Sequence, residues 1–351
     1  MTDKREFEGG YLPRRLAHRK KRTGLVVLLS AIAVVVVVAV VASTYLGSLA
    51  QTFNNKTQVI AEAFPDEEFR PIKNPDDGSL NFLLLGVDHG ADGTETSDLL
   101  QGGGTDQRSD SMMLMHIPED RKGVYVMSIV RDLYTDIPGY GRQKINSSMA
   151  LGGVPLVVQT IEGMLDTKID HVAMIDFDGF KELTTALGGV TVHNDIEFYS
   201  TDNKKYFYPV GDVVLKGNQA LRFVRERKPF ADGDYQRVKN QQKFIKAVMN
   251  ELLSKDTLTN PTTIYEVIDK LSPYLSLDDG FDAATAAGLG LQLKDLRASG
   301  IEMFTLPTAG SSRSPGGESI ELRDEKAIEE IGKALRADTF KAYLDGANLE
   351  H

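Results

Sequence analysis

The sequence predicts an α/β fold in which a β-sheet lies between layers of helices, behind one N-terminal transmembrane helix. Two patterns in its 351 residues predict this fold. Short apolar runs of strand length alternate with segments of helical periodicity, and such alternation is typical of a sheet covered by helices. Before them stands a single apolar run that is long enough to cross a bilayer.

The long apolar run covers residues 25–46 and contains no charged side chain. A transmembrane helix needs about 20 apolar residues, and because backbone groups in lipid must bond within their own segment, the helix forms despite its many valines. A cleaved secretory signal is the alternative, although its apolar core usually has about 7–15 residues. Residues 1–24 carry eight Lys and Arg against three Asp and Glu. We therefore expect a single-pass protein of the cell membrane, with this tail in the cytoplasm and everything after Gly47 outside the cell.

The charge of the chain is divided unevenly. The whole sequence has 40 basic and 50 acidic residues, of which 32 and 47 follow position 46. The part expected outside the cell therefore has a net charge of −15. Because nucleic-acid binding depends on basic groups that neutralise phosphates, we expect no nucleic-acid partner. The absence of cysteine excludes disulfides, thiolate metal sites and cysteine nucleophiles.

The exported part divides by composition into three segments. Residues 47–79 are rich in proline and acidic side chains, which is typical of a stalk or linker. The folded domain is expected at residues 80–310, and residues 311–351 are expected as a turn followed by a charged helix. Strands are expected at residues 81–88, 112–117, 124–130, 172–175 and 190–193. Helices are expected at residues 155–165 and 180–187, in a long segment that ends near residue 253, and at 324–335, with further α/β-like segments at 283–296 and 301–306.

Polar side chains stand where several of the apolar runs end. Asp88 ends the first run, Arg131 and Asp132 follow the third, and Asp176 follows the fourth. Ligands of open α/β sheets gather at the carboxyl ends of strands, so these positions are candidates for a site. The alternative is that each of them caps a helix or fills a turn, which is the more common role of a single Asp at a strand end.

Basic side chains gather later in the chain. Residues 222–228 contain three arginines and a lysine, which on spacing alone is also typical of a solvated charged face. Arg237 and Gln241 are four residues apart near the start of the long predicted helix, so they share one face of it. The N-terminal end of a helix favours an anion. The pattern therefore indicates an anion site near this helix.

Several motifs follow one another in order through residues 80–255, and to about 310 in weaker form. They are Gly86-Val-Asp88, Arg108-Ser-Asp-Ser111, Ser128-Ile-Val-Arg-Asp132, Lys144-Ile-Asn146, Gly152-Gly153, Asp178-Gly-Phe180, Leu187-Gly-Gly-Val190, Ala220 to Arg227, and Asp234-Tyr-Gln-Arg237 with Gln241. Their joint order resembles the LytR-CpsA-Psr family, Gram-positive enzymes that attach wall teichoic acids, capsules and related glycopolymers to peptidoglycan. Two features depart from the family pattern: Val130 stands where a proline is expected, and residues 89–107 form a long Gly-rich loop.

The resemblance implies a central mixed β-sheet flanked by helices, and a phosphotransferase that moves a phosphate-linked glycopolymer from a polyprenyl-pyrophosphate carrier to peptidoglycan. It also implies a Mg²⁺ or Mn²⁺ cofactor at Asp88 and Asp110. Phosphoryl transfer depends on arginine forks and a divalent cation that position and neutralise oxygens. The pyrophosphate-binding residues implied are Arg108, Arg131, Lys144, Arg225, Arg227, Arg237 and Gln241. The catalytic residues implied are Arg108, Asp110, Arg131, Asp132 and Asp234.

Some choices remain open on the sequence. Asp88, Asp110 and Asp234 are all candidates for the general base, and Asp132 is expected to orient an arginine. An apolar tunnel for the prenyl chain is expected from the resemblance. The alternative functions are a membrane-anchored regulator or lipid-binding protein without catalysis, and a pyrophosphatase that uses water as the acceptor. The expected topology argues against a regulator that acts on DNA, because DNA is on the other side of the membrane.

Overall fold

The computed structural model describes residues 23–87, 109–201, 206–230, 233–252, 254–258 and 260–347. The chain divides into two compact units, Met1–Ser48 and Leu49–His351. Helix α1 (Thr23–Lys56) includes the whole apolar run of residues 25–46. Outside residues 23–38, whose side chains the structure does not describe, one helix of the described part is long and apolar enough to cross a membrane. It is α3 (Ser147–Leu165), and 67% of its apolar window is buried inside the protein, as in the core helix of a folded domain.

A seven-stranded mixed sheet forms the centre of the second unit. Its order is β1-β12-β7-β2-β3-β4-β13. The central strand β2 pairs parallel with β7 and antiparallel with β3, which confirms the mixed sheet that was expected. The strands are β1 (Gln58–Ile60), β2 (Leu80–Val87), β3 (Ser109–Ile117), β4 (Val124–Ile129), β7 (His171–Asp176), β12 (Leu275–Asp278) and β13 (Ile301–Thr305).

The remaining strands form three smaller sheets. Strand β8, expected as part of the main run of strands, pairs instead with β11 in a two-stranded sheet. Its side chains alternate between buried and exposed, because only one face of this small sheet is covered. The smaller sheets comprise β8 (Val190–Asn194) with β11 (Gly211–Leu215), β9 (Phe198–Tyr199) with β10 (Phe207–Tyr208), and β14 (Thr308–Arg313), β15 (Ser319–Arg323), β5 (Leu133–Ile137) and β6 (Gly141–Lys144) in that order.

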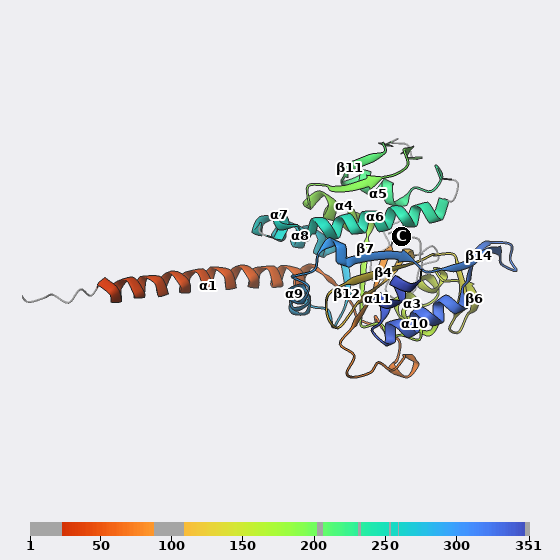
Figure 1. The fold of residues 1–351 in the computed structure, drawn as a ribbon, viewed down its shortest axis with the longest axis horizontal. Helices are drawn as coiled ribbons and strands as arrows, with labels where there is room; N and C mark the ends of the chain where they lie inside the picture. The colour runs from red at the N-terminus through yellow and green to blue at the C-terminus, as the bar shows by residue number, and fades with distance from the viewer. Residues whose placement is uncertain are drawn as a thin grey trace, which may run out of the picture. The chain divides into compact units, whose positions relative to one another are not determined.

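Helices cover both faces of the central sheet. In Figure 1, α6 crosses one face of the sheet, whereas α3, α10 and α11 lie on the other. Beyond α1 and α3, the helices are α4 (Phe177–Ala186), α5 (Gly217–Arg225), α6 (Gly233–Leu252), α7 (Lys255–Leu258), α8 (Pro261–Leu271), α9 (Ala283–Gln292), α10 (Glu325–Arg336) and α11 (Phe340–Gly346). Short 3-10 turns are η1 (Glu67–Phe69), η2 (Ser272–Tyr274) and η3 (Ala298–Gly300).

Helix α3 consists of two helical segments separated by a glycine pair. Gly152 and Gly153 leave the helical conformation, and Gly153 has a φ of +64°, which glycine adopts without the steric cost that a side chain brings. Pro155 stands at the beginning of the second segment, where its missing N–H costs little. The second segment ends at Leu165 and agrees with the helix predicted for residues 155–165.

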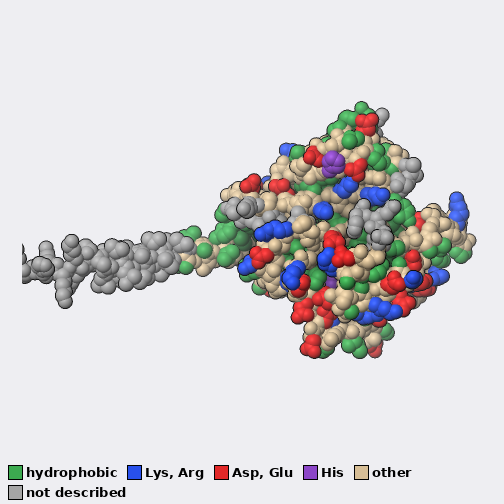
Figure 2. Space-filling model, in the orientation of Figure 1, with side chains coloured by type: hydrophobic (Ala, Val, Ile, Leu, Met, Phe, Trp, Pro, Cys, Tyr) green, Lys and Arg blue, Asp and Glu red, His purple; other side chains and the backbone are tan. Residues whose placement is uncertain are grey.

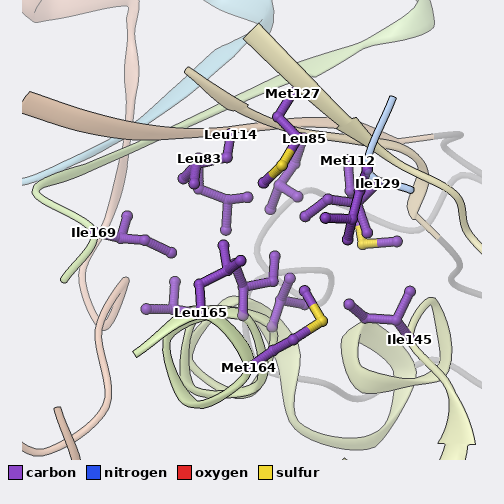
Figure 3. Close-up of a cluster of buried hydrophobic side chains, with 14 of the residues drawn as sticks. Leu83, Leu85, Met112, Leu114, Met127, Ile129, Ile145, Met164, Leu165 and Ile169 are labelled. Carbon is purple, nitrogen blue, oxygen red and sulfur yellow. The ribbon is translucent and has the colours of Figure 1, made fainter. Parts of the chain in front are cut away.

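The face of the sheet toward α3 is fully packed. Figure 3 shows Leu83 and Leu85 of β2 and Leu114 of β3 above Met164 and Leu165 of α3. All five side chains are buried. Burial of such side chains stabilises the fold by about 1.5–3 kcal/mol each. This layer holds the central strands, and therefore their ends, in fixed positions.

The opposite face of the sheet is packed less completely. Leu84 of β2 and Met115 of β3 keep part of their surface accessible, although both belong to central strands. The side chains that cover this face include Ile245 and Met249 of α6, which are also partly accessible. The two faces of one sheet thus differ in how tightly helices close over them.

Charged side chains on the face drawn in Figure 2 stand in small groups of both signs. The described Lys and Arg side chains of that face form no continuous stripe.

The segment expected as a linker contributes to the core of the second unit. Strand β1 is the edge strand of the central sheet beside β12. Arg70 donates through Nη2 to Glu162 Oε1 of α3 at 2.8 Å and through Nε to both carboxylate oxygens at 3.2 Å. The side chains of Arg70 and Glu162 are only 5% and 0% exposed. The folded unit therefore begins well before residue 80.

The C-terminal segment is also part of the core. Ile331 and Leu335 of α10 and Phe340 of α11 belong to the same apolar cluster as α3. After α10, Asp338 accepts a hydrogen bond through Oδ2 from the Glu119 N–H at 3.0 Å, and its Oδ1 lies 3.1 Å from His116 Nε2. The described residues 311–347 thus complete the domain, whereas the sequence suggested a separate turn and charged helix at residues 311–351.

We predict that Arg70→Ala lowers the free energy of unfolding by about 3–5 kcal/mol, because it leaves the Glu162 carboxylate buried without its cation. Denaturant unfolding of the full chain in detergent micelles measures the change. Lys168→Ala is the matched control, since Lys168 pairs at 2.8 Å with the exposed Glu67 and an exposed pair contributes at most about 1 kcal/mol. Equal losses in the two variants would contradict the prediction.

The stability of the C-terminal segment is predicted to depend on pH through Asp338. Burial raises the pKa of Asp338, but the hydrogen bonds from His116 and from the Glu119 N–H outweigh burial and hold the pKa below its usual value. A carboxyl with a lowered pKa stabilises the fold fully above its unfolded pKa of about 3.9, and this stability is lost as the pH falls through the folded pKa.

Asp338→Asn should therefore lower the free energy of unfolding by about 1–3 kcal/mol at pH 7. The difference from the wild type should shrink as the pH is lowered through the acidic range in which Asp338 is protonated. Thermal melts across that range measure it. Asp345→Asn, which removes an exposed partner of Lys341 at 3.1 Å, should show little effect at either pH, and a pH-independent loss for Asp338→Asn would refute the prediction.

Candidate active site

One edge of the central sheet collects the ends of five strands. Strands β2, β4, β7 and β13 run in one direction and β3 runs in the opposite one. The carboxyl ends of four strands therefore meet the amino end of β3 at the same edge. Ligands of α/β sheets bind outside the carboxyl ends of strands, so this edge is the place where a site is expected.

Arg131 and Asp132 lie in the turn that follows β4. The Leu133 N–H donates to Val130 O at 3.1 Å and closes the turn. The β5–β6 hairpin then returns to this turn, and Lys144 Nζ lies 3.1 Å from Asp132 Oδ1. Arg131 Nε lies 3.8 Å from Asp132 Oδ2, and its side chain is only 18% exposed. The structure thus brings three of the predicted residues together, with one carboxylate between two cations.

Arg225 lies at the carboxyl end of β7, which strand β2 separates from β3. It is the last residue of α5, and its Cζ atom lies 4.2 Å from the centre of the Phe177 ring. Phe177 directly follows β7 and begins α4. A guanidinium over an aromatic face is attracted by the ring. This contact ties the cation to the sheet edge. Arg227, two residues further on, is exposed.

Hydrogen bonds hold helix α6 over the same edge of the sheet. Gln242 Nε2 donates to Ser128 Oγ at 3.0 Å and to Thr305 Oγ1 at 3.1 Å, at the ends of β4 and β13. Gln241 Nε2 donates to Val224 O of α5 at 3.3 Å. Arg237 precedes Gln241 by one turn on the same face, and it is 4% exposed. The face of α6 that carries Arg237 and Gln241 is therefore turned toward α5.

These contacts distribute three arginines around one sheet edge. Strands β7 and β4 are separated by β2 and β3, which at ~4.8 Å per spacing sets their ends about 14 Å apart. Arg225 is tied to the β7 end, Arg131 follows β4, and Arg237 comes from the helix above β4 and β13.

Four of the predicted residues cannot be assigned a side-chain position. Asp88 and Arg108 lie outside the described residues, as do the side chains of Asp110 and Asp234. The backbone of Asp110 is described. Gly86 pairs with Ser111 and Val87 with Ser109, so Asp110 is the extra residue of a β-bulge. Bulges change the direction of a side chain and are frequent beside active sites.

A metal site is not assembled from the described part of the chain. That part contains no group of three His, Asp or Glu side chains that could hold a metal ion. Asp132, the described carboxylate that pairs with Arg131, lies between Lys144 and Arg131. The carboxylates expected to hold magnesium belong to Asp88 and Asp110, so the magnesium site stays a prediction.

A group of residues that the sequence did not indicate joins α6 to the turn after β4. The Glu321 N–H donates to Asp132 O at 2.9 Å. The hydroxyl of Tyr235, in the first turn of α6, donates to Glu321 Oε2 at 3.1 Å and lies 3.0 Å from Thr308 Oγ1. Glu321 was missed because it lies in the segment 311–351, which carried no motif. No local signal in the sequence marks it, since its partners are distant in the chain.

Comparison with known protein families identifies the family of this chain. The model of the LytR_cpsA_psr family matches residues 43–337. The chain belongs to this family. The resemblance carried by the ordered motifs is thereby confirmed, and the match includes β1, β14, β15 and α10.

Curated members of the family give the same assignment. A protein of Enterococcus faecalis named polyisoprenyl-teichoic acid–peptidoglycan teichoic acid transferase TagU is 37% identical over 255 residues, which are 72% of this chain and 78% of that protein. A protein of the same name from Bacillus mycoides is 33% identical over 231 residues, covering 62% of this chain and 71% of its own.

Solved structures share the fold. TagV of B. subtilis has a TM-score of 0.63 at 22% identity and covers 75% of this chain and 98% of its own. A structure described as TagT bound to LI-WTA has a TM-score of 0.60 at 25% identity and covers 79% of this chain and 98% of its own. The central mixed sheet flanked by helices is therefore the fold of this family.

The attachment of α6 through Gln242 predicts a local effect of Gln242→Ala. The variant loses two hydrogen bonds and leaves the buried Ser128 hydroxyl without this donor, at a cost of about 1–3 kcal/mol. Hydrogen exchange of the amides in the first three turns of α6 should become faster, while exchange in α3 stays as in the wild type. Lys246→Ala, at an exposed position of the same helix, is the control. Unchanged exchange in α6 would show that Gln242 does not hold the helix.

Proposed function

We propose that the chain is a membrane-anchored extracytoplasmic phosphotransferase that moves a phosphate-linked glycopolymer from a polyprenyl-pyrophosphate carrier to peptidoglycan. The observation that carries the proposal is the set of three arginines, Arg131, Arg225 and Arg237, around one sheet edge in a chain of this family. The names of the curated relatives describe a polyisoprenyl-linked teichoic acid as donor and peptidoglycan as acceptor.

The proposed reaction is a displacement at phosphorus. A hydroxyl oxygen of peptidoglycan attacks the phosphorus that carries the glycan, and a new O–P bond forms. The bond from that phosphorus to the bridging oxygen breaks, and polyprenyl phosphate leaves with this oxygen. The hydroxyl proton passes to a general base, for which Asp88, Asp110 and Asp234 are the candidates. Such a reaction needs positioning and charge neutralisation more than covalent participation by the protein.

The described residues suit these requirements. Guanidinium groups present several N–H donors in a plane and bind phosphate oxygens in pairs. Asp132 holds Arg131 and Lys144 on its two oxygens, so its proposed role is to position these cations. Arg225, Arg227 and Gln241 are proposed to bind the same pyrophosphate together with Arg108.

Magnesium or manganese is proposed as the cofactor, held by Asp88 and Asp110. The backbone position of Asp110 supports this, because its β-bulge lies at the sheet edge beside Val87, the residue before Asp88. Carboxylate oxygens are the ligands that these hard cations prefer. A bound cation would neutralise negative charge on the pyrophosphate oxygens.

The less completely packed face of the central sheet, which α6 covers, supports the proposal of a lipid-linked donor. Leu84 and Met115 of the sheet, and Ile245 and Met249 of α6, are apolar and partly accessible. Exposed apolar surface between layers is costly unless a ligand covers it. We propose that the first prenyl units of the carrier lie between the sheet and α6.

The membrane anchor is proposed to be α1. Its residues 25–46 are mostly apolar and contain no charged side chain, and the basic tail before them favours a cytoplasmic N-terminus. The domain would then stand outside the cell, where peptidoglycan is found. A donor that arrives already activated suits this location, because no ATP pool exists there.

Substitution of the arginines tests the proposal. With the full chain in detergent, Mg²⁺, a lipid-pyrophosphate glycan and peptidoglycan fragments, Arg131→Ala and Arg237→Ala should lower kcat/KM by about 10²–10³. Release of polyprenyl phosphate and covalent joining of glycan to the fragments are measured together. Arg131→Lys should restore only part of the rate, because lysine lacks the fork of donors.

Arg313→Ala is the matched control, because Arg313 is exposed near the end of β14. It should retain the wild-type rate. Thermal melts of all variants distinguish loss of activity in a folded variant from loss of the fold. Turnover that is independent of Arg131 and Arg237 in folded protein would reject the proposed site. Release of polyprenyl phosphate without covalent joining would indicate the pyrophosphatase instead.

A further inference from the structure

The folded unit begins almost directly after the apolar run of α1. The run ends at Leu46, and the second compact unit starts at Leu49, whose side chain is buried. Three residues span at most about 11 Å in any conformation. The headgroup layer on each side of a bilayer is about 5–7 Å thick. With residues 25–46 in the membrane, the surface around the end of α1 is therefore within reach of the lipid headgroups.

Helix α9 has an unusual composition for a helix on the surface of a folded domain. Its ten residues include no charged side chain, and none of them is buried. A surface helix normally carries charged side chains on its outer face. In α9 the inner side chain Leu289 packs against the apolar cluster of the sheet. Ala284, Ala287 and Leu291, spaced three and four residues apart, form an apolar stripe on the outer surface, where Leu291 is 71% exposed.

Two contacts tie α9 and α8 to the end of α1. The Ala283 N–H, at the start of α9, donates to Asn54 Oδ1 at 2.9 Å. Lys56 Nζ pairs with Asp269 Oδ1 of α8 at 2.7 Å. Tyr265 precedes Asp269 by one turn on the same face of α8 and is 40% exposed. Both helices are thus held beside the last residues of α1.

Strand β1 adds an exposed apolar side chain at the same place. Val59 follows the last residue of α1 by three residues and is 58% exposed. It pairs with Leu277, which pairs with Ala173, which in turn pairs with Leu84 of β2. Directly paired residues lie on the same face of a sheet, so Val59 is on the face that α6 and α9 cover. The anchor-side surface consists of Val59, Tyr265, Ala284, Ala287 and Leu291.

The place of the anchor-side surface indicates what covers it. A single exposed apolar side chain is normal, but a group of them on three elements beside one another marks an interaction surface. The bilayer is the apolar partner that the chain itself brings within reach, and tyrosine is enriched at membrane interfaces. The charges nearby are of both signs: Lys56, Lys270 and Lys294 against Glu266, Asp269, Asp279 and Asp282. Burial of apolar surface therefore drives the contact, without a requirement for anionic lipid.

We propose that the anchor-side surface rests in the headgroup layer of the membrane, with its apolar side chains at the boundary to the acyl chains. Helices with one apolar face lie in the plane of this layer. The contact of one short helix is weak, but the anchor holds it at a high effective concentration, so a weak contact suffices. The domain thereby has one preferred orientation on the membrane. This inference rests on the proposed function, because it takes residues 25–46 as the anchor.

Single-cysteine labelling tests the contact, because the chain contains no cysteine. Full-length Leu291→Cys and Val59→Cys carry a fluorophore and are reconstituted in vesicles of neutral phosphatidylcholine, with or without a lipid that bears a quencher near its headgroup. Both labels should lose most of their fluorescence to the quencher. Ser312→Cys is the matched control, since Ser312 is exposed on β14, at the end of the second unit that lies away from α9 (Figure 1). Its label should stay bright.

Charges on α9 should lift the whole surface off the bilayer. Ala287→Glu with Leu291→Glu places two carboxylates at the apolar boundary, where an unpaired charge is costly. The label on Val59 should then be quenched much less, although Val59 belongs to a different element. Ala287→Leu keeps the stripe apolar and should retain the quenching. Added salt should change the wild-type quenching little, because the surrounding charges nearly balance. Thermal melts show whether each variant is folded.

The outcomes distinguish the inference from the proposed function. If alkaline carbonate extracts the chain from the vesicles, residues 25–46 are no anchor, and the proposed function and the inference fail together. If the chain stays in the vesicles and the labels on Leu291 and Val59 are as bright as the label on Ser312, the inference alone is overturned. Equal quenching of all three labels overturns it as well, since the domain then has no preferred orientation. Disulfide cross-links between unlabelled Leu291→Cys chains, with the label shielded from lipid, would assign the surface to a second copy instead.

Discussion

Several positive charges are held around one edge of the central sheet, although like charges repel. The fold meets this constraint by giving each cation a separate support. Arg225 lies against the face of Phe177, Arg131 and Lys144 have the Asp132 carboxylate between them, and Arg237 comes from a buried position on α6. The pyrophosphate proposed to bind there would replace repulsion by attraction, and the supports of the cations would reduce the cost of ordering flexible side chains.

The supports come from distant parts of the chain, and the central sheet is what brings them together. Its α3 face is closed by a tightly packed apolar layer, which fixes the strand ends. Its other face is covered by α6, which Gln242 fastens to β4 and β13. The α3 face thus keeps the sheet rigid, whereas the α6 face leaves some apolar surface accessible beside the charged edge. A lipid-linked anion has the same division between an apolar tail and a charged head.

The elements of this fold could be predicted where the signal is local. The strands at residues 81–88, 112–117, 124–130 and 172–175 follow from apolar runs, and the structure contains them with ends shifted by at most three residues. The helix predicted at 155–165 corresponds to the second segment of α3. The ordered motifs indicated the family. The domain limits were less accurate, because Arg70 reaches Glu162 across 92 residues and Glu321 reaches Tyr235 across 86 residues of the chain. No property of either residue's neighbours reveals such a partner.

The pairing of β15 with β5 has a consequence for the synthesis of the protein. The turn that holds Arg131 and Asp132 is made early, whereas Glu321, whose N–H bonds to Asp132 O, is made near the end of the chain. Contacts between such distant residues form late in folding. A nascent polypeptide therefore carries the charged residues of the site before it has the frame that orients them, and the site matures only when almost the whole chain has emerged.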